Sequence, residues 1–152
     1  MPAKRNRAGG KLRRQYAALP VRLTADGTPE ILLVTSRETQ RWIIPKGWPM
    51  RKRSPSQAAA REAYEEAGLE GEIETERPIG SYRYEKRLRN GSIARIEVSI
   101  FLLHVARQLP VWPEQAERQT RWFGPAEAAD NVAEPELASI LRGVQASGGS
   151  IR

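Results

Sequence analysis

Three carboxylates stand close together in the segment from Gly47 to Leu69, which reads GWPMRKRSPSQAAAREAYEEAGL. At about 100° per residue, Glu62, Glu65 and Glu66 share one face of a helix. Like charges within one helical turn repel each other, so the arrangement favours a bound cation. Mg²⁺ takes oxygen ligands and commonly joins carboxylates to substrate phosphates. The spacing therefore predicts a magnesium site; the alternative interpretation is a charged helix face in solvent.

The helix that carries these carboxylates has clear boundaries in the sequence. Ser54, with Gln57 three residues later, makes a capping box, and Pro55 falls at the first turn, where proline is tolerated. Gly68 supplies the end of the helix. We expect small residues to gather on the face opposite the carboxylates, namely Ala59, Ala60, Ala63, Tyr64 and Ala67. This face would pack on a sheet and turn the acidic face toward a cleft.

The rest of the chain predicts strands interrupted by this helix and closed by another. Extended segments are expected at residues 15–23, 31–36, 42–44, 72–88 and 93–105. A tight turn with two positive φ angles is expected at Asn90 and Gly91. The final helix begins near Pro135 and ends before Gly143. The pattern predicts an α/β sandwich with a mixed central sheet.

The carboxylate segment resembles the signature of the Nudix hydrolase family, G-x5-E-x7-R-E-U-x-E-E-x-G-U, in which U is an aliphatic residue. The matching residues are Gly47, Arg61, Glu62, Ala63, Glu65, Glu66, Gly68 and Leu69. Arg53 departs from the signature, which has glutamate there. In the family that glutamate plays a supporting role, so its replacement bears on metal affinity or rate. The resemblance extends over about residues 14 to 143 and points most to the diphosphoinositol polyphosphate phosphohydrolase branch.

The resemblance implies a fold, an activity and a set of site residues. The fold is a Nudix-type α/β/α sandwich with a central mixed β-sheet. The activity is Mg²⁺-dependent cleavage of a phosphoanhydride in a highly phosphorylated small molecule, either a diphosphoinositol polyphosphate or a dinucleoside polyphosphate, with Mn²⁺ as an alternative metal. The implied catalytic and metal residues are Glu62, Glu65 and Glu66, with Gly47 added to the metal set. The implied substrate contacts are Arg14, Ser36, Arg37, Lys46 and Arg53.

Three questions stay open at this point. The general base varies within the family, so Glu62, Glu114 and Glu117 are all candidates. The substrate could instead be the 5′-triphosphate end of RNA, because residues 1–14 carry six lysines or arginines and no acid. A third interpretation is a Nudix-like regulatory module that binds a polyphosphate without cleaving it, which the Arg53 departure favours and the three retained glutamates oppose.

Composition narrows the remaining choices. The chain has 152 residues and no cysteine, which excludes disulfides, a thiolate nucleophile and a Cys-ligated zinc site. His104, the only histidine, is expected to be a packed or hydrogen-bonded strand residue. No apolar run reaches the length of a membrane span, so we expect a cytoplasmic protein with no membrane partner. One domain, residues 14–143, is predicted between a basic tail at 1–13 and a second tail at 144–152; the sequence makes no prediction of oligomeric state.

Overall fold

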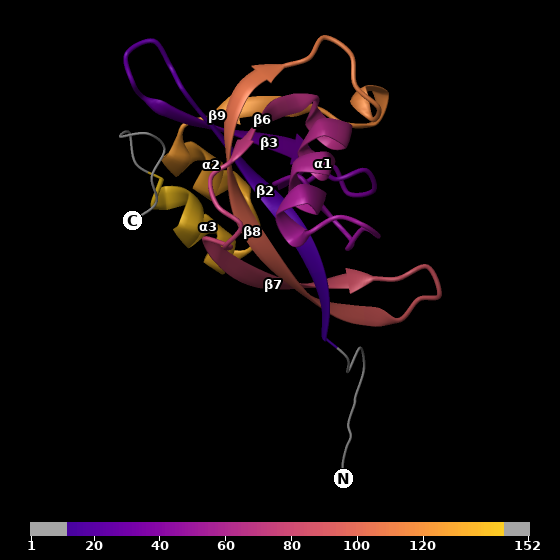
Figure 1. Ribbon diagram of the computed structural model, residues 1–152. Coiled ribbons are helices and arrows are strands. Elements are labelled where there is room, and N and C mark those ends of the chain that lie inside the picture. Colours follow the sequence, from indigo (N-terminus) through magenta and orange to yellow (C-terminus); the bar gives the residue numbers. More distant parts are fainter. Residues whose placement is uncertain (1–11, 145–152) are drawn as a thin grey trace.

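The computed structural model describes residues 12–144, so the two predicted tails lie almost entirely outside the described residues. Within this range the strands form one mixed sheet of eight strands. Helix α1 (Pro55–Ala67) covers one face of the sheet, while α2 (Pro125–Asn131) and α3 (Pro135–Arg142) cover the other (Figure 1). The sheet thus lies between two helical layers, which confirms the predicted α/β sandwich.

The strands and one short helix have the following bounds. The strands are β2 (Leu12–Leu23), β3 (Pro29–Thr35), β4 (Trp42–Ile43), β5 (Lys46–Gly47), β6 (Leu69–Ile73), β7 (Gly80–Arg87), β8 (Ile93–Gln108) and β9 (Thr120–Phe123). A 3₁₀ turn, η1, spans Gln115–Glu117. Because β2 begins at Leu12, residues 12 and 13 belong to the sheet rather than to the basic tail. Val144 is also buried, so the folded unit runs one residue beyond the predicted end.

The centre of the sheet is a long parallel pair. Strands β2 and β8 run side by side from the pair Leu12 and Arg95 to the pair Val21 and His104. Parallel strands need a crossover connection, and the chain between them contains α1. The remaining pairs are antiparallel. One buried cluster lies under α1, and another lies under α2 and α3.

Two details of the predicted strands are wrong. The extended segment 72–88 is two strands, which follow one another along the same edge of β8, opposite β2. Ile73 pairs with Leu103 and Gly80 with Ile100, so residues 74–79 are too many to continue the ladder and divide it into β6 and β7. The turn lies where it was predicted, but only Gly91 has a positive φ, of 89°. The side chain of Asn90 instead accepts a hydrogen bond from the backbone N–H of Ser92 at 2.9 Å, which stabilises the turn locally.

Helix α1 matches its predicted boundaries but not all of its predicted faces. The Ser54 and Gln57 capping box forms, and Gly68 ends the helix with φ 70°. Ala59, Ala63 and Ala67 are buried, whereas Ala60 and Tyr64 are only partly so. Glu66 is 3% exposed because it lies three residues after Ala63 and seven after Ala59, on the edge of the same face. The acidic and alanine faces are therefore adjacent, and one carboxylate lies in the seam between α1 and the sheet.

Two further predictions can be compared with the structure. His104 on β8 shares a hydrogen bond with Glu74, with Nε2 and Oε1 2.7 Å apart, as expected for a hydrogen-bonded strand histidine. No helix within residues 12–144 is both long enough and apolar enough to cross a membrane.

Candidate active site

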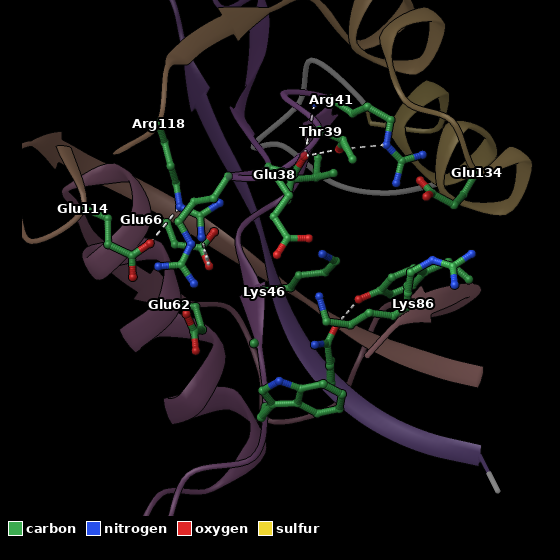
Figure 2. A pocket seen from close by; sticks show the side chains of 18 of the residues that line it. Glu38, Thr39, Arg41, Lys46, Glu62, Glu66, Lys86, Glu114, Arg118 and Glu134 are labelled. Atoms are coloured by element: carbon green, nitrogen blue, oxygen red, sulfur yellow. Dashed lines mark hydrogen bonds and ion pairs between the residues drawn. The ribbon is translucent and has the colours of Figure 1, made fainter. Parts of the chain in front are cut away.

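A cavity of about 520 Å³ opens where α1, β5 and β7 meet the loops after β3 and β8. Figure 2 shows two groups of side chains facing it. Glu62, Glu66 and Glu114 lie together with Arg118 on one wall, which we call the carboxylate wall. Lys46 and Lys86 lie across from them, on what we call the lysine wall. Glu38, Glu85 and Glu134 also line the cavity, so its acidic residues are not confined to the carboxylate wall.

Glu66 is the buried centre of the carboxylate wall. Its Oε2 lies 3.5 Å from the Arg118 guanidinium, but its Oε1 is buried and has no hydrogen-bond partner. Burial raises the pKa of Glu66 well above its ordinary value; Arg118 opposes this effect and Glu62 adds to it. A buried carboxylate oxygen without a partner is costly for the folded protein. A divalent cation is the kind of ligand that would satisfy it, so the donor set fits the predicted metal.

Glu62 owes its position to a glycine. A Cβ atom on Gly47 would lie 1.9 Å from Glu62 Oε2, so residue 47 must lack a side chain for the carboxylate to rest against β5. Burial, with the charges of Glu65 and Glu114, raises the pKa of Glu62 to about 6, while a side-chain hydrogen bond with Glu66 opposes this shift. The first glycine of the signature and its first helix glutamate are therefore one structural unit.

The predicted metal residues do not form a ready-made cage. Among residues 12–144, no three acidic or histidine side chains converge on one point in the way a preformed metal site would require. Ion pairs divide the acids instead, because Arg61 holds Glu65 at 2.7 Å and Arg118 holds Glu114 at 2.8 Å. The metal set of Glu62, Glu65, Glu66 and Gly47 therefore stays a prediction, and binding would have to draw Glu65 away from Arg61 or use its other oxygen.

A late loop closes the carboxylate wall over the end of α1. Trp112 donates its indole N–H to the backbone carbonyl of Glu66 at 3.1 Å, and the N–H of Glu114 donates to the carbonyl of Glu65 at 2.9 Å. Arg118 connects the same loop to β3, because it donates to the backbone carbonyl of Thr35 at 3.0 Å. Glu114 consequently faces the cavity beside Glu66.

The two alternative bases are placed differently. Glu114 lines the cavity, whereas Glu117 does not and pairs with Arg37 at 3.0 Å. Arg118, which holds Glu114, was missed by sequence reasoning. The only signal for it was the i, i+4 spacing of Glu114 and Arg118, a pattern that is also common on surfaces.

The five predicted substrate contacts divide into two groups. Ser36, Arg37 and Lys46 line the cavity. Arg14 lies outside it and pairs with Glu97 on β8 at 3.0 Å. Arg53 is also outside, exposed, with its guanidinium 3.4 Å from the Met50 sulfur. The cavity also contains residues that no pattern indicated, namely Gln15, Arg41, Trp48, Tyr84, Lys86 and Glu134.

Comparison with known proteins identifies the family. The model of the NUDIX domain matches residues 13–144 of this chain. The chain belongs to the Nudix family. This Nudix chain is 34% identical over 127 residues to Nudix hydrolase 18, mitochondrial, of Arabidopsis thaliana, which covers 79% of this chain and 69% of that protein. It is 33% identical over 97 residues to diphosphoinositol polyphosphate phosphohydrolase 3-alpha of Mus musculus, covering 62% and 54%.

The Nudix fold is also supported by solved structures. The binary complex of a C. elegans Ap4A hydrolase superposes with a TM-score of 0.65 at 24% identity, covering 86% of this chain and 93% of that one. A NUDIX hydrolase from Nitrosomonas europaea gives a TM-score of 0.61 at 22% identity, covering 80% and 78%. At these identities the likeness concerns the fold. The chain spans between about half and two thirds of the length of curated relatives such as Nudix hydrolases 13 and 18.

The contact between Gly47 and Glu62 gives a testable prediction for this Nudix site. We expect Gly47→Ala to lower Mg²⁺-dependent turnover by about 10- to 100-fold, because the new methyl group displaces the Glu62 carboxylate. The free energy of unfolding should change by less than about 1 kcal/mol, since the displaced atoms end a flexible side chain. Steady-state kinetics and thermal melting measure both effects. Gly124→Ala, where a Cβ meets nothing within 4 Å, is the control; full turnover in Gly47→Ala would contradict the assignment.

Proposed function

We propose that this chain is a Mg²⁺-dependent pyrophosphohydrolase, with Mn²⁺ as an alternative metal, that cleaves a phosphoanhydride bond in a highly phosphorylated small molecule. The observation that carries the proposal is the buried, partnerless Oε1 of Glu66, in a cavity that Glu62, Glu114 and Lys46 also line. Diphosphoinositol polyphosphates and dinucleoside polyphosphates are the favoured substrates. The names of two similar proteins, a diphosphoinositol polyphosphate phosphohydrolase and an Ap4A hydrolase, support this choice.

The residues of the cavity suit each part of this reaction. Glu62, Glu65 and Glu66 would hold a divalent ion, which when bound neutralises phosphate charge and makes its water easier to deprotonate. Water attacks one phosphorus atom, the bridging P–O bond breaks, and the bridging oxygen leaves with the other phosphate. Glu62, with a pKa of about 6, and Glu114 are the candidates to accept the proton from the attacking water. Lys46 faces the negative charge that remains on the phosphates.

A substrate panel tests this function. Diphosphoinositol pentakisphosphate, diadenosine polyphosphates, ADP-ribose, nucleoside triphosphates and 5′-triphosphorylated RNA would each be incubated with Mg²⁺ and with EDTA. We expect cleavage of the inositol or dinucleoside class with Mg²⁺ and none with EDTA. Without a cation, the carboxylate wall would repel a polyphosphate. Phosphate or nucleotide release is the readout.

The same panel decides between the alternatives. Cleavage of RNA alone, with strong salt dependence, would favour the function at RNA 5′ ends. The basic tail invoked for that function lies mostly outside the described residues. Binding without cleavage would favour the regulatory module and direct attention to Arg53. A cytoplasmic location stays a prediction, and several similar proteins are named as mitochondrial.

A further inference from the structure

Trp48 is an exposed aromatic residue in the wall of the cavity. Among residues 12–144, the exposed large hydrophobic residues are Leu23, Trp48 and Val111, and of these three only Trp48 lines the cavity. It is 38% exposed. Leaving apolar ring surface in water is unfavourable for the folded protein, because that surface gains nothing from burial. Exposed aromatic rings within a pocket are typical of ligand-binding sites.

The other three tryptophans have partners within the fold. Trp42 makes a ring contact with a phenylalanine, Trp112 donates a hydrogen bond to a backbone carbonyl, and Trp122 lies under an arginine. Within the described residues 12–144, the Trp48 side chain makes none of these three kinds of contact. The face of its ring is therefore not used by another ring or by a cation of this part of the chain.

The backbone holds Trp48 close to the carboxylate wall. The preceding residue, Gly47, lies against Glu62, whose carboxylate occupies the place that a Cβ atom would take. Side chains alternate along extended backbone, so Lys46 and Trp48 lie on the opposite side of this segment. Pro49 follows directly and restricts Trp48 to extended backbone angles. The indole therefore stands on a restrained segment, one residue away from the glycine that positions Glu62.

The charges of the cavity do not suit a ligand that is anionic on every side. Seven glutamates and six lysines or arginines line it. Glu134 lies across the cavity from Glu62 (Figure 2). Burial raises the pKa of Tyr84, and the nearby charge of Glu134 adds to this shift. An inositol ring with a phosphate on every carbon has no uncharged side to place against such acids, whereas a nucleotide has an uncharged base.

We propose that Trp48 is the platform on which a nucleobase of the substrate stacks, so that the site takes nucleoside polyphosphates in preference to diphosphoinositol polyphosphates. The inference rests on the proposed function in one respect, namely that the phosphates of the same ligand lie at the carboxylate wall. Stacking on an aromatic ring uses the face of the base and tolerates different bases. Adenine and guanine nucleotides are therefore both expected to bind.

A nucleotide that cannot be cleaved tests the platform without turnover. The first probe is ATP with methylene groups in place of both bridging oxygens of its triphosphate, and the second is the same triphosphate without adenosine, each titrated with Mg²⁺ present. We expect Trp48→Ala to weaken binding of the nucleotide about tenfold, the loss of one stacked base, and to leave binding of the triphosphate within twofold.

A matched control truncates an exposed apolar residue outside the cavity. Val111 is 74% exposed and does not line the cavity, so Val111→Ala should leave the affinity for both probes within twofold of wild type. An unchanged ratio of the two affinities in Trp48→Ala, or no binding of the nucleotide by wild type, would overturn the proposal.

Indole fluorescence separates stacking from a structural effect. A base stacked on an indole quenches its emission, so the nucleotide probe should quench part of the wild-type fluorescence and the triphosphate should not. The quenching should be absent from Trp48→Phe, because the other three tryptophans do not line the cavity. Trp48→Phe keeps an aromatic face and should bind the nucleotide within threefold of wild type. Quenching that persists in Trp48→Phe, or a lowered melting temperature of Trp48→Ala with no rescue of binding by phenylalanine, would assign Trp48 a purely structural role.

Kinetics then relate the platform to the proposed function and keep the two separable. If the chain cleaves diadenosine tetraphosphate, Trp48→Ala should lower kcat/KM about tenfold, mainly through KM, because the base is held alike before and during the reaction. Cleavage of diphosphoinositol pentakisphosphate but not of the dinucleotide would overturn the platform while the hydrolase stands. Nucleotide binding that depends on Trp48, with no turnover of any substrate, would refute the hydrolase while the platform stands.

Discussion

Glu66→Gln is expected to reduce Mg²⁺-dependent turnover about 1,000-fold while making the metal-free protein more stable. The loss would follow because the buried Oε1, the proposed ligand of the cation, becomes part of an amide, which carries no charge to hold a metal ion. The gain follows from the raised pKa of Glu66, which means that the folded protein disfavours the charged carboxylate. Arg118 keeps its contacts with Glu114 and Thr35, so the substitution leaves no orphaned cation.

Thermal melting with and without Mg²⁺ measures both the stability of the metal-free protein and its stabilisation by the metal. Without metal, Glu66→Gln should melt about 3 °C higher than wild type, which corresponds to about 1 kcal/mol in a domain of this size. Added Mg²⁺ should raise the melting temperature of wild type and leave that of the variant unchanged. Glu72→Gln makes the same chemical change on exposed β6 and should match wild type in both measurements. A variant that keeps the Mg²⁺-induced shift would refute the role assigned to Glu66.

Gly68→Ala should have the largest effect on stability, a loss of about 3 kcal/mol in the free energy of unfolding. Two costs combine at this position. Gly68 has φ 70°, a left-handed conformation that costs a side-chain-bearing residue about 1 kcal/mol. A Cβ atom there would also lie 2.4 Å from the Trp112 ring, which would have to move with the loop that holds Glu114. Denaturant unfolding followed by circular dichroism gives the number.

A second glycine separates the two costs. Gly91 has φ 89° but open space around its Cβ direction, so Gly91→Ala should lose only the backbone part, about 1 kcal/mol. If both variants lost the same free energy, the packing of Trp112 against Gly68 would contribute nothing. The glycine near the end of the signature would then serve only the helix end.

The sequence predicted those parts of the fold that depend on local interactions. The capping box at Ser54 and the end of α1 at Gly68 rest on contacts within a few residues, and both are present. The division of segment 72–88 into β6 and β7 depends on the pairing with β8, where residues 74–79 are too many for the step from Leu103 to Ile100. That information is not local, and an extended pattern looks the same in either case.

The same difference between local and long-range information applies to the residues of the candidate site. Glu62 and Glu66 are marked by their spacing on one helix, so the sequence placed them correctly in the cavity. Lys86 lines the cavity only because of its place on β7. Neither its residue type nor its sequence neighbours predicted this position. Arg53 was favoured because it is close to α1 in sequence; it does not line the cavity and contacts Met50 instead. Its contact with substrate stays a prediction.

The parallel pairing of β2 with β8 also determines how long β2 stays unpaired while the chain is being synthesised. Leu12 and Arg95, which lie opposite each other in the sheet, are 83 residues apart in the chain. At a ribosomal rate of about 5–20 residues per second, the first central strand is made roughly 4 to 17 s before its partner. During that interval the apolar run through Ala17, Ala18 and Leu19 has no β8 beside it. Synthesis must therefore pass His104, the last β8 partner of β2, before this early strand is fully paired, and the strand is most exposed to aggregation during that interval.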